Sequence, residues 1–128
     1  MQDRDKLDLF KAALALAAAD QQITRAELGI LEGLAAKVGI GQKSFEAMKT
    51  AALRGEGLAD KVCFSSPEMA RKALELLVAE ARIDGEISEP ERRLLVALAE
   101  RLKIATEEFL TIYQAGIQRA DELRARRK

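Results

Sequence analysis

The feature that most constrains this 128-residue chain is an internal repeat. Residues 9–48 align without a gap on residues 73–112, at a constant offset of 64 positions. A gapless match of this length indicates that one supersecondary unit occurs twice. The ten identical pairs are Ala15/Ala79, Ala17/Ala81, Asp20/Asp84, Ile23/Ile87, Glu27/Glu91, Leu31/Leu95, Leu34/Leu98, Ala35/Ala99, Ile40/Ile104 and Phe45/Phe109.

Each copy has the sequence pattern of three helices. Apolar residues recur at the 3-4-3 spacing of a single helical stripe, and glycine or capping residues separate the stripes. Aromatic residues are scarce, with four Phe, one Tyr and no Trp, whereas a β-sandwich or barrel would want more aromatic and β-branched residues. We therefore predict an all-α fold: a compact bundle of about six helices in two pseudo-repeated three-helix units, forming a single domain over residues 1–128. The predicted helices span residues 6–19, 25–38, 42–53, 67–83, 89–103 and 106–123.

Both copies carry one acidic loop with the pattern D-x-x-I-[ST]-x-x-E. In it, Thr24 and Ser88 precede helices, and Glu27 and Glu91 follow three positions later. This is the capping box, in which the hydroxyl accepts from a helical N–H and the glutamate accepts from the N–H of the capping residue. A complete structural explanation of the loop is therefore available.

The second loop also fits part of a calcium-binding loop. When residues 80–91 are laid on the twelve positions of an EF-hand, Asp84, Gly85 and Glu91 match the pattern, but Arg82 occupies a ligand position. Calcium takes six to eight oxygen ligands, and this loop offers about four good ones. The loop by itself is thus a poor calcium site.

Two such loops at one end of a bundle would pool their carboxylates. Clustered carboxylates repel one another, which is energetically costly unless a metal ion or a basic partner neutralises their charge. The candidate metal ligands are Asp20, Glu27, Asp84, Glu86 and Glu91. The candidate ion is Ca²⁺ or Mg²⁺, no other cofactor is expected, and the alternative is two solvated helix caps without metal.

At these residues the chain resembles the TerB-like family, which is named for bacterial tellurite resistance. The resemblance rests on residues 17–27 and 81–91 and covers about residues 9–112. It implies a helical bundle in two pseudo-repeats, a role in stress or tellurite response, and a metal site at Asp20, Glu27, Asp84 and Glu91. The first loop departs from the family pattern, with Gln21-Gln22 where Gly and an acidic residue are common.

Composition argues against several classes of function. The chain has no histidine, and no phosphate-binding glycine loop follows a strand, so we expect no enzyme. The 21 basic and 21 acidic residues balance, which disfavours nucleic-acid binding. The basic stretch 119–128 is interpreted as the end of a helix, where cations are favourable, and a polyanion-binding tail is the alternative.

Location and partners follow from weaker signals. The apolar run 9–19 is too short to cross a bilayer and has a counterpart in the repeat, so neither membrane insertion nor a signal peptide is expected. Cys63 lies in an apolar run, which favours a buried thiol, and as the single cysteine it fits a reducing compartment. We predict a cytoplasmic interaction module whose partners are other proteins, and a homodimer is kept as an alternative.

Overall fold

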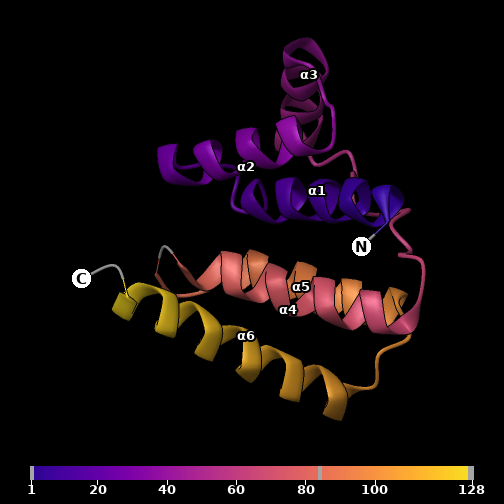
Figure 1. The fold of residues 1–128 in the computed structure, drawn as a ribbon, viewed down its shortest axis with the longest axis vertical. Coiled ribbons are helices and arrows are strands. Elements are labelled where there is room, and N and C mark those ends of the chain that lie inside the picture. The colour runs from indigo at the N-terminus through magenta and orange to yellow at the C-terminus, as the bar shows by residue number, and fades with distance from the viewer. Residues whose placement is uncertain (1, 84, 127–128) are drawn as a thin grey trace. The chain divides into compact units, whose positions relative to one another are not determined.

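The computed structural model describes residues 2–83 and 85–126, and within these ranges it contains helices and loops without a strand (Figure 1). The predicted all-α fold of about six helices is confirmed. The bounds predicted for the third and fourth helices are those observed, and the other helices differ from prediction by three residues at most. The six helices are α1 (Asp3–Ala17), α2 (Arg25–Lys37), α3 (Gln42–Leu53), α4 (Pro67–Ile83), α5 (Glu89–Arg101) and α6 (Thr106–Arg126).

The chain divides into two compact units, Met1–Ser65 and Ser66–Lys128. In the first unit, α1 packs against both α2 and α3, and in Figure 1 α2 runs alongside α1 while α3 is steeply inclined to it. In the second unit, α4 makes its most extensive contact with α6, and α5 packs against both of them. Each unit thus has three helices, while the internal repeat and the single domain remain predictions from the sequence.

The ends of α2 and α5 have the same backbone geometry. The Ile40 N–H donates to the Ala35 carbonyl at 2.9 Å, and the Ile104 N–H donates to the Ala99 carbonyl at 2.9 Å. This six-to-one bond is the mark of the Schellman motif, which needs a left-handed residue just before the donor. Gly39 supplies it after α2 with φ of 77°. After α5, Lys103 adopts that conformation, with φ of 61°, in place of glycine.

The first unit is built around α1. Phe10 and Leu14 of this helix are fully buried, and the Phe10 ring lies 6.0 Å from the ring of Phe45 on α3, measured between centroids. Leu31 of α2 is also fully buried. The apolar faces that the spacing predicted therefore do form the core of this unit.

Two buried carboxylates of α1 hold the segment that leads to α4. Asp5 accepts hydrogen bonds from the Ser65 N–H at 2.6 Å and from the Ser65 hydroxyl at 2.7 Å. Asp8 accepts from the N–H groups of Cys63 and Phe64, at 3.3 and 3.2 Å. The hydrogen bonds to Asp5 lower the pKa of its carboxyl group, with the Ser65 hydroxyl as the main cause. Their effect outweighs that of burial, which alone would raise this pKa.

In the second unit, charged pairs flank the contact between α4 and α6. Arg71 pairs with Glu108 at 2.8 Å, and Arg119 pairs with Glu75 at 2.9 Å. Exposed pairs such as these contribute little individually, about 0–1 kcal/mol. α4, which packs against both α5 and α6, also buries seven apolar residues, namely Ala70, Ala73, Leu74, Leu77, Val78, Ala79 and Ala81.

Candidate functional site

The acidic loops form the capping boxes that the sequence predicts. The Glu27 N–H donates to the Thr24 hydroxyl at 3.1 Å, and the Thr24 N–H donates to Glu27 Oε1 at 3.0 Å. In the second loop the Glu91 N–H donates to the Ser88 hydroxyl at 3.3 Å, and the Ser88 N–H donates to Glu91 Oε1 at 2.9 Å. Glu27 and Glu91, two of the glutamates proposed as metal ligands, therefore each have one oxygen engaged in a helix cap.

Asp20 of the first loop lies in the turn that follows α1. Asp20 Oδ1 accepts from the Gln22 N–H at 3.1 Å, so this carboxylate closes the turn after α1. The adjacent Gln21 has a left-handed φ of 66°, and Gly85, which aligns with it, has a φ of 143°. Asp84 lies outside the described residues.

The described carboxylates do not by themselves make up a metal centre. Glu86 is exposed and Glu91 is 8% exposed, while Asp20 and Glu27 belong to the first unit. Over residues 2–83 and 85–126 there is no group of three or more His, Cys, Asp or Glu side chains that could hold a metal ion. A site completed by Asp84 stays a prediction.

Cys63 differs from expectation. We predicted a buried thiol from its apolar neighbours, but Cys63 is exposed, whereas Val62 and Phe64 on either side of it are buried. The reason is the backbone of this segment, which turns alternate side chains inward while Asp8 holds its N–H groups. The exposed sulfur accepts a hydrogen bond from Arg4 Nη2.

The basic end of α6 is partly used within its own unit. Arg124 Nε donates to the carbonyl of Ile83 at 2.8 Å, at the end of α4, and Asp121 of α6 accepts from Arg82 at 3.3 Å. The arginine thus satisfies a carbonyl at a helix C-terminus, where a cation is favourable. These contacts support the interpretation as a helix end.

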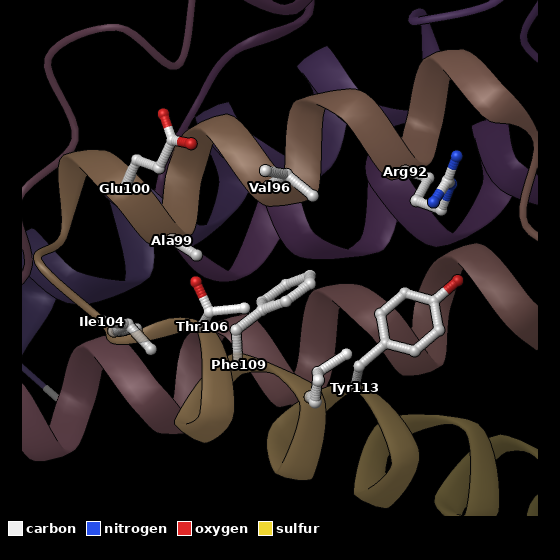
Figure 2. A pocket seen from close by; sticks show the side chains of 9 residues that line it. Arg92, Val96, Ala99, Glu100, Ile104, Thr106, Phe109 and Tyr113 are labelled. Atoms are coloured by element: carbon white, nitrogen blue, oxygen red, sulfur yellow. The ribbon is translucent and has the colours of Figure 1, made fainter.

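A groove between α5 and α6 is a feature that the sequence reasoning missed. Figure 2 shows the rings of Phe109 and Tyr113 on α6 directed toward α5, which carries Val96. The groove has a volume of about 290 Å³. Its lining is mainly apolar with a few polar residues: Arg92, Val96, Ala99, Glu100, Ile104, Thr106, Phe109, Leu110 and Tyr113.

Two apolar residues of this groove are exposed to an unusual degree. Leu110 is 54% exposed and Val96 is 37% exposed. The repeat supplies a sequence signal that would have found them: the residues of the first copy that align with Val96 and Leu110 are Glu32 and Glu46. A solvated position of the first copy has thus become apolar in the second, twice within one groove.

The charged residue at one end of the groove is tied to the start of α5. Arg92 Nη2 donates to Glu89 at 2.7 Å (Oε2) and 2.8 Å (Oε1), and Arg93 also pairs with this carboxylate at 3.4 Å. The hydrogen bond from Arg92 lowers the pKa of Glu89, and Glu89 raises the pKa of Arg92. Among the described residues Glu100, further along α5, makes no side-chain hydrogen bond or ion pair.

Comparisons with known proteins leave the family undecided. Neither a known protein family, nor a curated protein, nor a solved structure matches this chain. The resemblance to the TerB-like family therefore remains a prediction from the two loops. Of the helices in residues 2–83 and 85–126, none is both long enough and apolar enough to span a membrane.

Proposed function

We propose that this chain is a non-enzymatic interaction module of the TerB-like type, which binds a helical segment of a second polypeptide chain in the α5–α6 groove. The observation that carries the proposal is the open apolar lining, in which Leu110 is 54% exposed. Large apolar side chains gathered in a groove mark binding surfaces more often than isolated exposed ones do. Grooves between two helices commonly accept the apolar face of a third.

The residues around the groove favour binding over catalysis. The chain has no histidine, and the polar groups at the groove are Arg92, Glu100, Thr106 and Tyr113. Arg92 is held by Glu89, and among the described residues no hydrogen bond joins the hydroxyl of Thr106 or Tyr113 to the Glu100 carboxylate, as a nucleophile and its base would require. Polar groups of this kind orient a partner at the rim of an interface.

The wider role that we propose comes from the resemblance. It includes a stress response of the tellurite-resistance type, a cytoplasmic location, protein partners and no nucleic-acid binding. The balanced charge of the chain supports the last point, and the single cysteine supports a reducing compartment. A divalent ion at the acidic loops is the second part of this proposal, and its test is described in the Discussion.

A selection from a library of helical peptides displayed on phage tests the proposal. The full chain is immobilised, and the affinities of selected peptides are measured by calorimetry for the wild type and for Leu110→Glu. This substitution places at 110 the side chain that the first copy has at the aligned position 46. Because Leu110 is largely exposed, the substitution leaves stability unchanged to within about 0.5 kcal/mol.

We expect binding to Leu110→Glu to be at least about tenfold weaker, which is about 1.4 kcal/mol. Lys43→Glu, on an exposed position of α3 in the other unit, is the matched control and should bind as the wild type does. A selection that yields no peptides, or peptides that bind both variants equally, would show that the groove is not the binding surface. The alternative is then a purely structural helical or dimerisation domain without metal.

A further inference from the structure

The exposed side of α5 carries charges in a symmetric arrangement. Five exposed residues lie at spacings of 3, 4, 4 and 3: the first four share one side of α5, and the fifth, Lys103, follows the end of the helix with a left-handed φ of 61°. In chain order the stripe is Glu89, Arg92, Val96, Glu100 and Lys103. The signs run negative, positive, neutral, negative, positive, so that inverting the order about Val96 inverts every charge.

A sequence of this kind is complementary to itself when read in the opposite direction. If two α5 helices pack antiparallel across a twofold axis at Val96, residue numbers that face each other add up to 192, twice 96. Arg92 of one chain then faces Glu100 of the other chain. Each lies about 6 Å from the axis along its helix, because four residues separate it from Val96 at about 1.5 Å per residue. Glu89 and Lys103 also carry opposite charges seven residues to either side of Val96, but Lys103 lies beyond the end of α5, so this second pair is matched in sequence and charge alone. Symmetry produces each pair twice.

From this complementarity we infer that the partner of the α5–α6 groove is a second copy of this chain, with the two α5 helices antiparallel. The inference rests on the proposed function, because it assigns an occupant to the same groove. A twofold interface uses one patch on both subunits, so the patch must complement itself, as this stripe does. Parallel packing would instead oppose like charges at every charged position of the stripe.

The apolar residues at the groove fit the centre of such an interface. Val96 lies on the axis, and Leu110 and Tyr113 of α6 line the same groove. Contact with a second α5 would cover Val96 and Leu110, the two exposed apolar residues here. Glu100, with no side-chain partner among the described residues, would gain one in Arg92 of the other chain. Apolar contact at the centre with charges at the rim is the usual arrangement of an interface.

The pattern is confined to the second unit. The positions of the first copy that align with Arg92, Val96 and Glu100 are Leu28, Glu32 and Ala36. That stripe has a charge at its centre and apolar residues on both sides, so it lacks the self-complementarity of α5. The inferred dimer therefore has one interface of defined location.

Sedimentation equilibrium of the full chain from about 1 μM to about 1 mM tests the inference. We expect a monomer–dimer equilibrium whose dissociation constant rises with salt, since exposed charges are screened within about 10 Å at 0.1 M. Arg92→Glu opposes like charges at both symmetric positions, and so does Glu100→Arg. Each variant alone should dissociate at least about tenfold more readily than the wild type.

Combining the reversals restores the complementarity. In an equimolar mixture of the Arg92→Glu and Glu100→Arg variants, one chain has two glutamates and the other two arginines, so that a heterodimer forms although each variant alone is monomeric. The double variant should regain a homodimer. Lys43→Glu and Glu32→Arg are matched single reversals on exposed positions of the other unit and should leave the equilibrium unchanged. Circular dichroism checks that all variants are folded.

Two results would overturn the inference. One is a wild-type chain that is still monomeric at about 1 mM, and the other is a dimer that neither charge reversal weakens. The peptide selection distinguishes these results from a failure of the proposed function. If the chain is monomeric but selected peptides depend on Leu110, the groove binds another protein and only the second copy is ruled out. If neither assay detects binding, both proposals fail.

Discussion

Gly116 of α6 lies so close to Val78 of α4 that a side chain has no room between them. A Cβ built on Gly116 would be 2.6 Å from both Cβ and Cγ1 of Val78, and 2.9 Å from the carbonyl oxygen of Glu75. Non-bonded carbon atoms normally approach to about 3.5–4.0 Å. The close contact of α4 and α6, on which the second unit is built, therefore depends on glycine at position 116.

Gly116→Ala should lower the free energy of unfolding. Overpacking of a tight contact costs about 1–3 kcal/mol, and the better helix propensity of alanine returns about 1 kcal/mol of this at most. We expect a net loss of about 1 kcal/mol, measured by urea denaturation. Because the backbone of α4 cannot yield as a flexible side chain does, the loss should not be relieved by local repacking.

Gly33→Ala is the matched control for this prediction. Gly33 lies within α2, and a Cβ on it would meet nothing within 4 Å. The same chemical change should therefore stabilise the chain, by about 0.5–1 kcal/mol, through helix propensity alone. Equal effects of the two substitutions would show that the close approach at Gly116 has no energetic consequence.

Gln21 adopts a left-handed conformation that favours glycine. Its φ is 66°, and the residue that aligns with it in the second copy is Gly85. A left-handed backbone costs a residue with a Cβ about 1–2 kcal/mol, part of which glycine loses again through its greater freedom in the unfolded chain. We expect Gln21→Gly to raise the melting temperature, with a gain of about 0.5–1 kcal/mol in stability. Gln21→Ala keeps the Cβ, and a similar gain there would refute the conformational explanation.

Asp5 should make stability depend on pH in the acid range. Its pKa is lowered from 3.8 by the hydrogen bonds of Ser65 and Gln2, so the folded state binds this proton less readily than the unfolded state. The resulting stabilisation is complete above about pH 3.8 and is lost as the pH falls through the lowered pKa of Asp5 in the folded state. The gap in unfolding free energy between wild type and Asp5→Asn should therefore be constant near neutral pH and shrink below pH 3.8.

The exposed Asp60 provides the comparison for this titration. Asp60→Asn makes the same chemical change at a carboxylate without a side-chain hydrogen bond among the described residues, and it should leave the unfolding free energy at neutral pH within about 0.5 kcal/mol of the wild type. Urea denaturation at several pH values between about 2.5 and 7 measures all three proteins. A constant gap for Asp5→Asn down to the lowest pH would mean that its bonds to Ser65 do not distinguish the two protonation states.

Local features of this structure could be predicted from the sequence, whereas contacts between residues far apart in the chain could not. The capping boxes at Thr24 and Ser88 were predictable because each involves four consecutive residues. The bonds of Asp5 to Ser65 were not, because they join residues 60 positions apart in the sequence. The exposure of Cys63 was mispredicted for the same reason: an apolar run does not say which of its members faces the core once Asp8 fixes the backbone.

The α5–α6 groove is an intermediate case. Periodicity assigns apolar residues to the face of a helix but does not tell which of them a neighbouring helix covers. Val96 and Leu110 fall on positions where the first copy has glutamates, and this difference between copies is visible without a structure. The repeat therefore held the signal for the groove, and a comparison of its differences, besides its identities, would have located it.

Metal binding at the acidic loops is the prediction on which the proposed TerB-like character depends most directly. Calorimetric titration with about millimolar Ca²⁺ or Mg²⁺ should give heat and raise the melting temperature, since a ligand that binds only the folded state stabilises it. The double variant Asp84→Asn with Glu91→Gln should show neither effect. Its fold should be retained, because glutamine can replace glutamate in a capping box.

A second variant separates a metal ligand from a helix cap. Thr24→Ala removes the hydroxyl that the Glu27 N–H donates to, and should cost about 1 kcal/mol in stability. Because the hydroxyl is not among the proposed ligands, the titration heat of this variant should equal that of the wild type. If neither ion gives heat or a change in melting temperature with the wild type, the carboxylates are helix caps alone, and the interaction module acts without metal.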